Sequence, residues 1–230
     1  MKLANPAPLG LAGFALPTWM LSMVNVGWFG HESVPMVLAL AFAFGGTAQF
    51  CAGLLEFPRG NTFGFVAFCA YGAFWWSFAL FVAFFKAGVP TAFVAWYLFM
   101  WGVFTAFMWI GTWRLNRALQ LIFLVLLATF FTLAAADWTG MAVIRGAGGY
   151  LGLATAVLGL YLGAAEIINE THGSEVLPIG TLVAQNRTGT TAAARGAAEL
   201  AVRPDRPLHG SASRPRCPAG ARCADGKRNR

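Results

Sequence analysis

The chain contains six long stretches without a charged residue, at 11–29, 34–55, 62–85, 91–112, 118–136 and 146–165. Each is about 19–24 residues long, and about 20 residues of α-helix cross the roughly 30 Å hydrocarbon core of a bilayer. Backbone N–H and C=O groups inside lipid must bond within the protein, so spanning runs of this kind form helices. We therefore predict an all-α integral membrane protein with six transmembrane helices per protomer.

The composition agrees with a chain that lies largely in lipid. Hydrophobic residues make up 58% of the 230 residues and charged residues only 11%, whereas soluble domains carry about 25% charged residues. The net charge of +7 arises in residues 181–230, which hold 10 of the 16 cations and 3 of the 9 acids. The positive charge therefore belongs to a tail, and we expect no nucleic acid as a partner.

The chain divides into a membrane domain and a tail. We predict a six-helix transporter domain over 1–180 and a basic, disordered tail over 181–230, because the tail has too few apolar residues to bury. An even number of spans places both ends of the domain on one side. The cations expected on that side are Lys2, Arg59, Arg114 and Arg117, against Lys86 and Arg145 on the other. This excess, with the basic tail, predicts cytoplasmic termini.

Two pairs of glycines follow a close-packing pattern in the last predicted span. They are Gly148-x-x-x-Gly152 and Gly159-x-x-x-Gly163, and this spacing lets helix backbones approach closely. Packing between helices of one protomer is the simpler interpretation. An interface between protomers is the alternative.

The amino-terminal motif consists of Asn5, Pro6, Ala7, Pro8, Leu9 and Gly10. Asn is a strong N-cap and Pro is favoured at the first helical position, so we expect a helix to begin here. The free N–H groups and the positive dipole end of such a helix attract anions. An ordinary helix start is the alternative interpretation.

Inside the predicted spans the polar side chains are all uncharged. A buried amide is costly unless it is paired, so Asn25 and Gln49 are candidates for polar contacts along a pathway, together with Thr18. The absence of ionisable groups from these spans argues against a relay of buried carboxylates, a voltage sensor or an arginine that clamps substrate. Such a passage suits a small, weakly charged or protonated solute.

The spans contain no pattern typical of catalysis. No Ser-His-Asp set, carboxylate pair or phosphate-binding loop is present, and the scattered His and Cys residues form no metal-ligand cluster. We therefore expect no enzymatic activity, no metal and no cofactor.

The segment Leu3–Phe14 resembles the signature of the acetate uptake transporter family, which includes bacterial succinate–acetate permeases and fungal acetate and ammonia-export-related proteins. Further segments resemble the family in the same order: Gly45–Gln49, Ala52–Glu56, Gly60–Gly64, Tyr71–Trp75, Trp101–Thr105, Glu166–Glu170 and Leu177–Gly180. The resemblance covers residues 3–180. Pro17 departs from it, since the family more often has a hydroxyl residue there.

The resemblance implies a permease or channel for acetate and succinate, proton-coupled or channel-like, in the bacterial inner membrane. It further implies a homo-hexamer whose protomers each have a constriction of Phe14, Tyr71 and Leu126. A ring of apolar side chains does not solvate a naked charge, so the protonated acid or a briefly dehydrated anion crosses more easily. Acetate, other small carboxylates, protons and the lipid bilayer are the expected partners.

Two other functions remain open from the residues alone. One is a channel for another small solute, such as urea, ammonia or water. The other is a membrane sensor or interaction protein that transports nothing. Uptake of acetate into proteoliposomes separates all three, because a sensor moves nothing and a urea channel ignores acetate.

Overall fold

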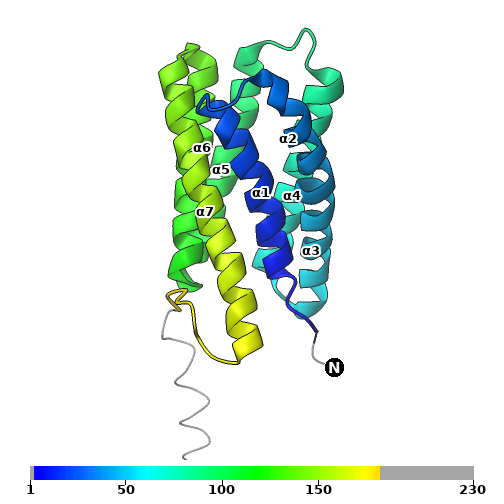
Figure 1. Cartoon of the computed structure of the whole chain (residues 1–230), viewed down its shortest axis with the longest axis vertical. Coiled ribbons are helices and arrows are strands. Elements are labelled where there is room, and N and C mark those ends of the chain that lie inside the picture. Colours follow the sequence, from blue (N-terminus) through cyan, green and yellow to red (C-terminus); the bar gives the residue numbers. More distant parts are fainter. Residues whose placement is uncertain (1–2, 182–230) are drawn as a thin grey trace, which may run out of the picture. The chain divides into compact units, whose positions relative to one another are not determined.

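In the computed structural model, which describes residues 3–181, the chain forms an antiparallel bundle of helices (Figure 1). The α-helices are α1 (Ala7–Asn25), α2 (Val34–Leu40), α3 (Gln49–Glu56), α4 (Thr62–Leu80), α5 (Thr91–Gly111), α6 (Arg117–Thr139) and α7 (Ala142–His172). Two π-helical segments continue them, η2 (Ala41–Ala48) between α2 and α3, and η4 (Phe81–Phe85) after α4. Short 3-10 turns occur at η1 (His31–Ser33), η3 (Phe57–Arg59) and η5 (Thr112–Arg114).

Six helical stretches in these residues are long and apolar enough to cross a membrane. They are Ala7–Asn25, His31–Arg59, Thr62–Phe85, Thr91–Arg114, Arg117–Thr139 and Ala142–His172. The second stretch combines η1, α2, η2, α3 and η3 in one rod. The prediction of an all-α protein with six spanning helices is confirmed. The predicted tail lies outside the described residues.

Helices α1 and α7 begin and end at other residues than the uncharged stretches 11–29 and 146–165 from which they are predicted. Helix α1 begins at Ala7 and ends at Asn25, because Gly27 turns the chain with a φ of +82°. Helix α7 begins at Ala142 and continues to His172, where Gly173 ends it with a φ of +65°. Charged residues therefore lie on the terminal turns of the helices as well as between them.

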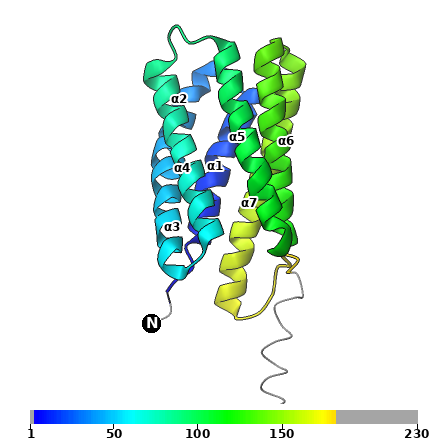
Figure 2. The ribbon, with the colours of Figure 1, turned by 180° about the vertical axis from the view of Figure 1, so that it is seen from behind.

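Helix α1 lies at the front of the bundle in Figure 1, in contact with α7 on one side and with η2, α3 and α4 on the other. Helix α5 packs against α6, and α6 packs against α7, which completes the bundle on the opposite face (Figure 2). The beginning of α1 and the ends of α3 and α7 lie at the same end of the bundle (Figures 1 and 2). Helices from distant parts of the chain therefore meet at this end.

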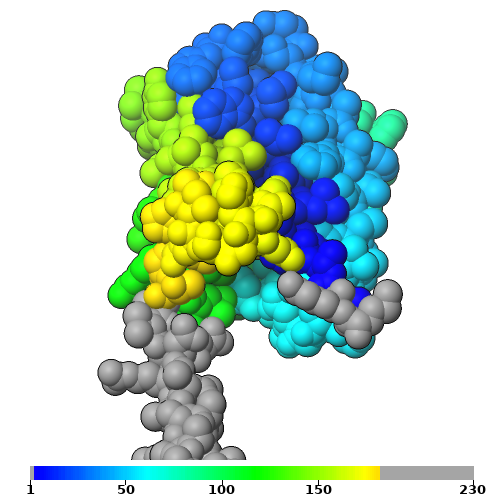
Figure 3. Space-filling model, turned by 60° about the horizontal axis from the view of Figure 1, so that its bottom comes forward, coloured from blue at the N-terminus to red at the C-terminus, as the bar shows by residue number. Residues whose placement is uncertain are grey.

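The glycines of α7 pack within the protomer. A Cβ atom on Gly159 would lie 3.2 Å from Ala15 Cβ, and one on Gly163 would lie 3.4 Å from Leu11 Cβ. Both neighbours belong to α1. These contacts support the simpler interpretation of the glycine pattern, in which it brings α7 close to α1. Figure 3 shows α7 beside the beginning of α1 at the end of the bundle.

Candidate functional site

A cavity of about 210 Å³ opens among α1, α4, α6 and α7, with the first residue of α3 in its wall. Most of its wall is apolar, with Leu11, Phe14, Phe68, Ile122, Phe123, Leu126 and Leu162 among the lining residues. The polar side chains in the lining are Gln49, Asn61, Tyr71, Asn116 and Glu166. The site is therefore a mostly apolar chamber with a few polar groups, which is typical of small-molecule sites.

The three residues expected at a constriction meet in this cavity. Phe14 on α1, Tyr71 on α4 and Leu126 on α6 all line it, and each is less than 10% exposed. The Phe14 and Tyr71 rings are tilted by 56° with their centroids 6.0 Å apart. Three different helices thus bring bulky side chains to one place, although their action as a gate stays a prediction.

The hydroxyl of Tyr71 is held by a chain of hydrogen bonds. Thr105 Oγ1 donates to the carbonyl of Trp101 over 2.7 Å, and Tyr71 Oη lies 2.8 Å from Thr105 Oγ1. Since a threonine hydroxyl has one hydrogen, the hydrogen between the two hydroxyls must come from Tyr71. Tyr71 therefore has no hydrogen left to donate to a solute.

Gln49 is the polar candidate that the fold places in the cavity wall. It follows the π-helical segment η2, and π-helical turns occur frequently at functional sites. Gly13 on α1 makes room for it, because a Cβ there would lie 3.0 Å from Gln49 Cβ. The Gln49 side chain is 1% exposed, and its Oε1 atom has no hydrogen-bond partner.

The other two polar candidates lie outside the cavity lining. Thr18 is buried, and its hydroxyl donates to the carbonyl of Phe14 over 2.6 Å, within α1. Asn25 is half-buried at the last residue of α1. The hydroxyl of Thr18 is thus used by its own helix.

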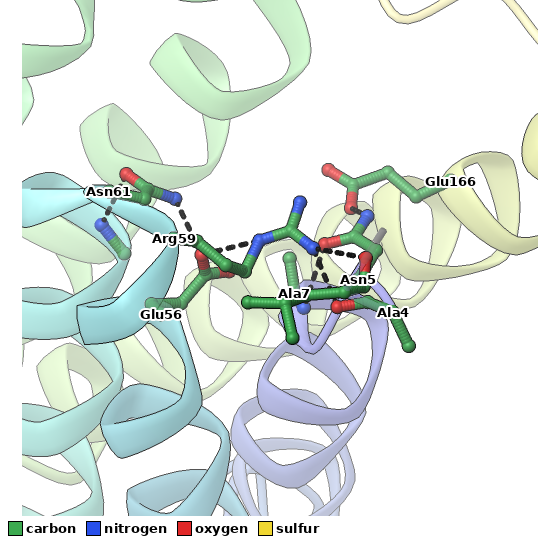
Figure 4. Close-up of polar contacts among 9 residues, drawn as sticks. Ala4, Asn5, Ala7, Glu56, Arg59, Asn61 and Glu166 are labelled. Atoms are coloured by element: carbon green, nitrogen blue, oxygen red, sulfur yellow. Dashed lines mark hydrogen bonds and ion pairs between the residues drawn. The ribbon is translucent and has the colours of Figure 1, made fainter. Parts of the chain in front are cut away.

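At the end of the cavity, the amino-terminal motif contacts α7 (Figure 4). Asn5 Nδ2 donates to Glu166 Oε2 over 2.9 Å, and Asn5 Oδ1 accepts from the N–H of Ala7 over 3.2 Å. Helix α1 starts at Ala7, with Pro6 before it, so the helix begins one residue later than the motif suggested. Asn5 therefore joins the start of α1 to a carboxylate in the cavity wall.

A second cluster at the same end consists of Glu56, Arg59 and Asn61 (Figure 4). Glu56 Oε2 lies 3.5 Å from Arg59 Nε and accepts from Asn61 Nδ2 over 3.0 Å. Arg59 Nη1 also donates to the carbonyls of Leu3 and Ala4, over 3.2 and 2.6 Å. The guanidinium thus ties the amino-terminal segment to the end of α3.

The two carboxylates correct one expectation from the sequence. Glu56 and Glu166 directly follow the uncharged stretches 34–55 and 146–165, so the sequence predicts that they lie outside the spans. Instead Glu56 is 1% exposed, and Glu166 lines the cavity. The premise that the spans bury no carboxylate is therefore wrong for Glu56, whereas the inference against a relay of carboxylates stays a prediction. The sequence could have indicated that both carboxylates lie on spanning helices, because no turn residue separates either of them from the apolar run before it.

Comparison with known proteins gives consistent matches. The family model described as the GPR1/FUN34/yaaH family matches residues 1–183. The succinate-acetate/proton symporter SatP of Escherichia coli K12 is 44% identical over 183 residues, which cover 78% of this chain and 96% of that protein. An uncharacterized protein of Methanothermobacter thermautotrophicus is 46% identical over 188 residues, covering 77% of this chain and 91% of the relative.

A solved structure shares the fold. The structure titled as that of the bacterial acetate channel SatP superposes with a TM-score of 0.75 at 43% sequence identity. The match covers 78% of this chain and 100% of that chain.

Proposed function

This chain belongs to the GPR1/FUN34/yaaH family, and we propose from that premise that it is a membrane permease for small carboxylates such as acetate and succinate. The observation that carries the proposal is the apolar cavity in which Phe14, Tyr71 and Leu126 meet. The named relatives are a symporter and a channel for such acids. They are not enzymes, which agrees with the expectation of no enzymatic activity.

The cavity accounts for a preference for small solutes. Bulky apolar side chains, Phe14 and Leu126 among them, line it. The rings of Phe14 and Tyr71 cannot move apart without disturbing the aromatic neighbours of Tyr71, namely Trp101, Phe104 and Phe123. Size exclusion at these rings therefore favours acetate over longer acids.

Transport is proposed to be coupled to protons. Apolar rings offer no solvation to an acetate anion, and Tyr71 has no hydrogen left to donate to one. At the end of the cavity, Glu56 lies 3.5 Å from Arg59, and Glu166 accepts a hydrogen bond from Asn5 (Figure 4). The lining itself contains the carboxylate of Glu166 and no Lys or Arg, so a solute that crosses with its proton is the better fit.

The assembly and orientation are proposals as well. Large apolar side chains cover the outside of the described bundle, including Phe42, Phe84, Phe93, Phe107 and Val143. Lipid and neighbouring protomers of a homo-hexamer would both cover such a surface. We place the protein in the bacterial inner membrane with both termini in the cytoplasm, because the end of the bundle near Arg59 carries the excess of cations.

The test is uptake of labelled acetate into proteoliposomes that contain the purified full-length chain. We expect uptake to rise when the outside is made acidic relative to the lumen, and labelled urea to stay outside. Empty liposomes give the background, since acetic acid also permeates lipid. Uptake no faster than in empty liposomes would contradict the proposal, and urea uptake without acetate uptake would indicate a channel for another solute.

A further inference from the structure

Gln49 presents an unsatisfied amide to an apolar cavity. Its side chain is 1% exposed and lines the cavity, and its Oε1 atom is buried without a hydrogen-bond partner. A buried carbonyl oxygen without a donor is costly, and each such group in a folded protein calls for an explanation. A ligand that brings a hydrogen to this oxygen would supply one.

The chemistry of the amide defines that ligand. A glutamine side chain offers one acceptor oxygen and two N–H donors, side by side in one plane. An undissociated carboxyl group has the opposite arrangement, an O–H donor next to a carbonyl acceptor. We infer that Gln49 binds the protonated form of the transported acid, with the acid O–H donating to Oε1 and the Gln49 N–H donating to the acid carbonyl.

A carboxylate anion fits this group less well. It has only acceptor atoms, so one of its oxygens would face Gln49 Oε1 without a hydrogen between them. Tyr71 gives no compensating donor, because its hydrogen is used by Thr105. The other ionisable group in the lining is Glu166, with Glu56 and Arg59 at the same end of the cavity (Figure 4). Carboxylates there do not help an anion enter.

Close packing of α1 fixes the base of the Gln49 side chain. Gly13 lies close to this segment, since an added Cβ would also lie 3.0 Å from the carbonyl oxygen of Phe44. The Cβ and backbone of Gln49 are therefore positioned by the backbone of α1, and its amide lies in the cavity lining. This inference rests on the proposed function and names the form of the substrate that its site selects.

The first experiment needs no variant. Uptake of labelled acetate by the wild-type protein in proteoliposomes is measured with unlabelled acetamide or trifluoroacetate as the competitor. Acetamide is neutral and has both a donor and an acceptor, whereas trifluoroacetate stays ionised in the assay. We expect acetamide to compete and trifluoroacetate not to compete. Competition by trifluoroacetate with none by acetamide would overturn the inference.

The second experiment replaces the amide. Gln49→Leu and Gln49→Met keep most of its volume but remove both hydrogen-bonding atoms, and we expect either to raise KM for acetate about tenfold, as the loss of one to two hydrogen bonds implies. Acetamide should also compete about tenfold less well. Thr129→Val is the matched control, because Thr129 is buried, donates to Val125 within α6 and lies outside the lining. It should leave KM within about twofold.

The outcomes separate this inference from the proposed function. If the wild-type protein takes up acetate but both Gln49 variants keep its KM and its inhibition by acetamide, the role of Gln49 is wrong and the permease assignment stands. If the wild-type protein takes up no acetate, both are wrong. Should neither variant fold, as judged by thermal unfolding and gel filtration, the wild-type competition result decides the matter.

Discussion

Asn5 and Glu166 are joined by a hydrogen bond of 2.9 Å between Nδ2 and Oε2, although 161 positions separate them in the chain. The bond connects the beginning of α1 to the last turns of α7 at the end of the cavity. Because Glu166 lines the cavity and Asn5 also accepts from the N–H of Ala7, this contact links the local start of a helix to the shape of the site.

Asn5→Ala should weaken this end of the bundle and slow transport. The change removes the donor to a carboxylate, a hydrogen bond worth about 2 kcal/mol in a protein. We expect a lower temperature of thermal unfolding in detergent, and acetate uptake that falls more than the amount of protein in the membrane. The double variant with Glu166→Ala tests the pairing: its loss of stability should be smaller than the sum of the two single losses by about 1 kcal/mol. Fully additive losses would contradict a direct contact.

The bulky residues of the constriction should control which acids pass. Phe14→Ala and Leu126→Ala shorten side chains that line the cavity, so succinate and larger carboxylates should gain uptake relative to acetate. The measurement is the ratio of initial rates for two labelled acids in proteoliposomes. Phe107→Ala is the control, because Phe107 is 55% exposed on α5. If the ratio is unchanged in both cavity variants, Phe14 and Leu126 do not select between the acids and the assignment of the constriction is wrong.

Much of the fold follows from where charge is missing. Apolar runs of spanning length predict six helices, because no other structure satisfies the backbone in lipid. The buried position of Glu56 could not be found in this way, because a rule that treats every charge as a boundary places it in a loop. Its partners Arg59 and Asn61 lie nearby in sequence, but its burial depends on how α3 packs in the bundle.

The site could be predicted only in part. Phe14, Tyr71 and Leu126 were expected together from a family resemblance, and Gln49 from the cost of a buried amide. Like Gln49, Thr18 is an uncharged polar residue within an apolar run, but its hydroxyl bonds to the carbonyl of Phe14 in its own helix. The difference is the direction in which each side chain points, which depends on helix rotation. The π-helical segment before Gln49 changes the rotation of the side chains that follow it. The sequence contains no pattern that predicts a π-helical segment at this place.

Gly13→Ala should destabilise the protein and impair transport together. The new Cβ would lie 3.0 Å from both Gln49 Cβ and the carbonyl oxygen of Phe44, so two helices must shift. Overpacking of this kind costs about 1–3 kcal/mol, and thermal unfolding of the purified protein measures it. Gly146→Ala is the matched control, since no atom lies within 4 Å of the Cβ added there. It should be neutral or gain up to about 1 kcal/mol from helix propensity.

Arg59→Ala should be harmful chiefly because it leaves Glu56 buried without its cation. Glu56 is 1% exposed but the Arg59 side chain is 30% exposed, so we expect the cost to lie below the ~3–5 kcal/mol of a fully buried pair. The variant also frees the carbonyls of Leu3 and Ala4. We expect low yield and a lower unfolding temperature.

The rescue of that variant identifies the cause. Adding Glu56→Gln removes the unpaired charge while an amide oxygen still accepts from Asn61, so much of the stability should return. Arg114→Ala removes an exposed cation and should leave stability unchanged. If the Arg59→Ala, Glu56→Gln double variant is as unstable as Arg59→Ala alone, the contacts to the amino-terminal segment matter more than the ion pair.

The last prediction concerns where the chain can be shortened. The segment after α7 is bonded to the body: the carbonyls of Ile179 and Gly180 accept from the N–H groups of Ala118 and Arg117, over 3.2 and 3.0 Å. The N–H groups in the first turn of a helix have no partner within that helix. The segment supplies acceptors to two of them and so acts as a cap for α6. Truncation after Val183, where the family match ends, keeps this cap and removes the basic tail.

We therefore expect the chain cut after Val183 to keep its abundance, its oligomer size and its acetate uptake. A chain cut after Val176 loses the cap, as well as the bond from Tyr161 Oη to the carbonyl of Pro178, and should unfold at a lower temperature. Gel filtration, thermal unfolding and uptake in proteoliposomes compare the two with the full-length chain. Loss of uptake at unchanged abundance after the cut at Val183 would show that the basic tail takes part in transport.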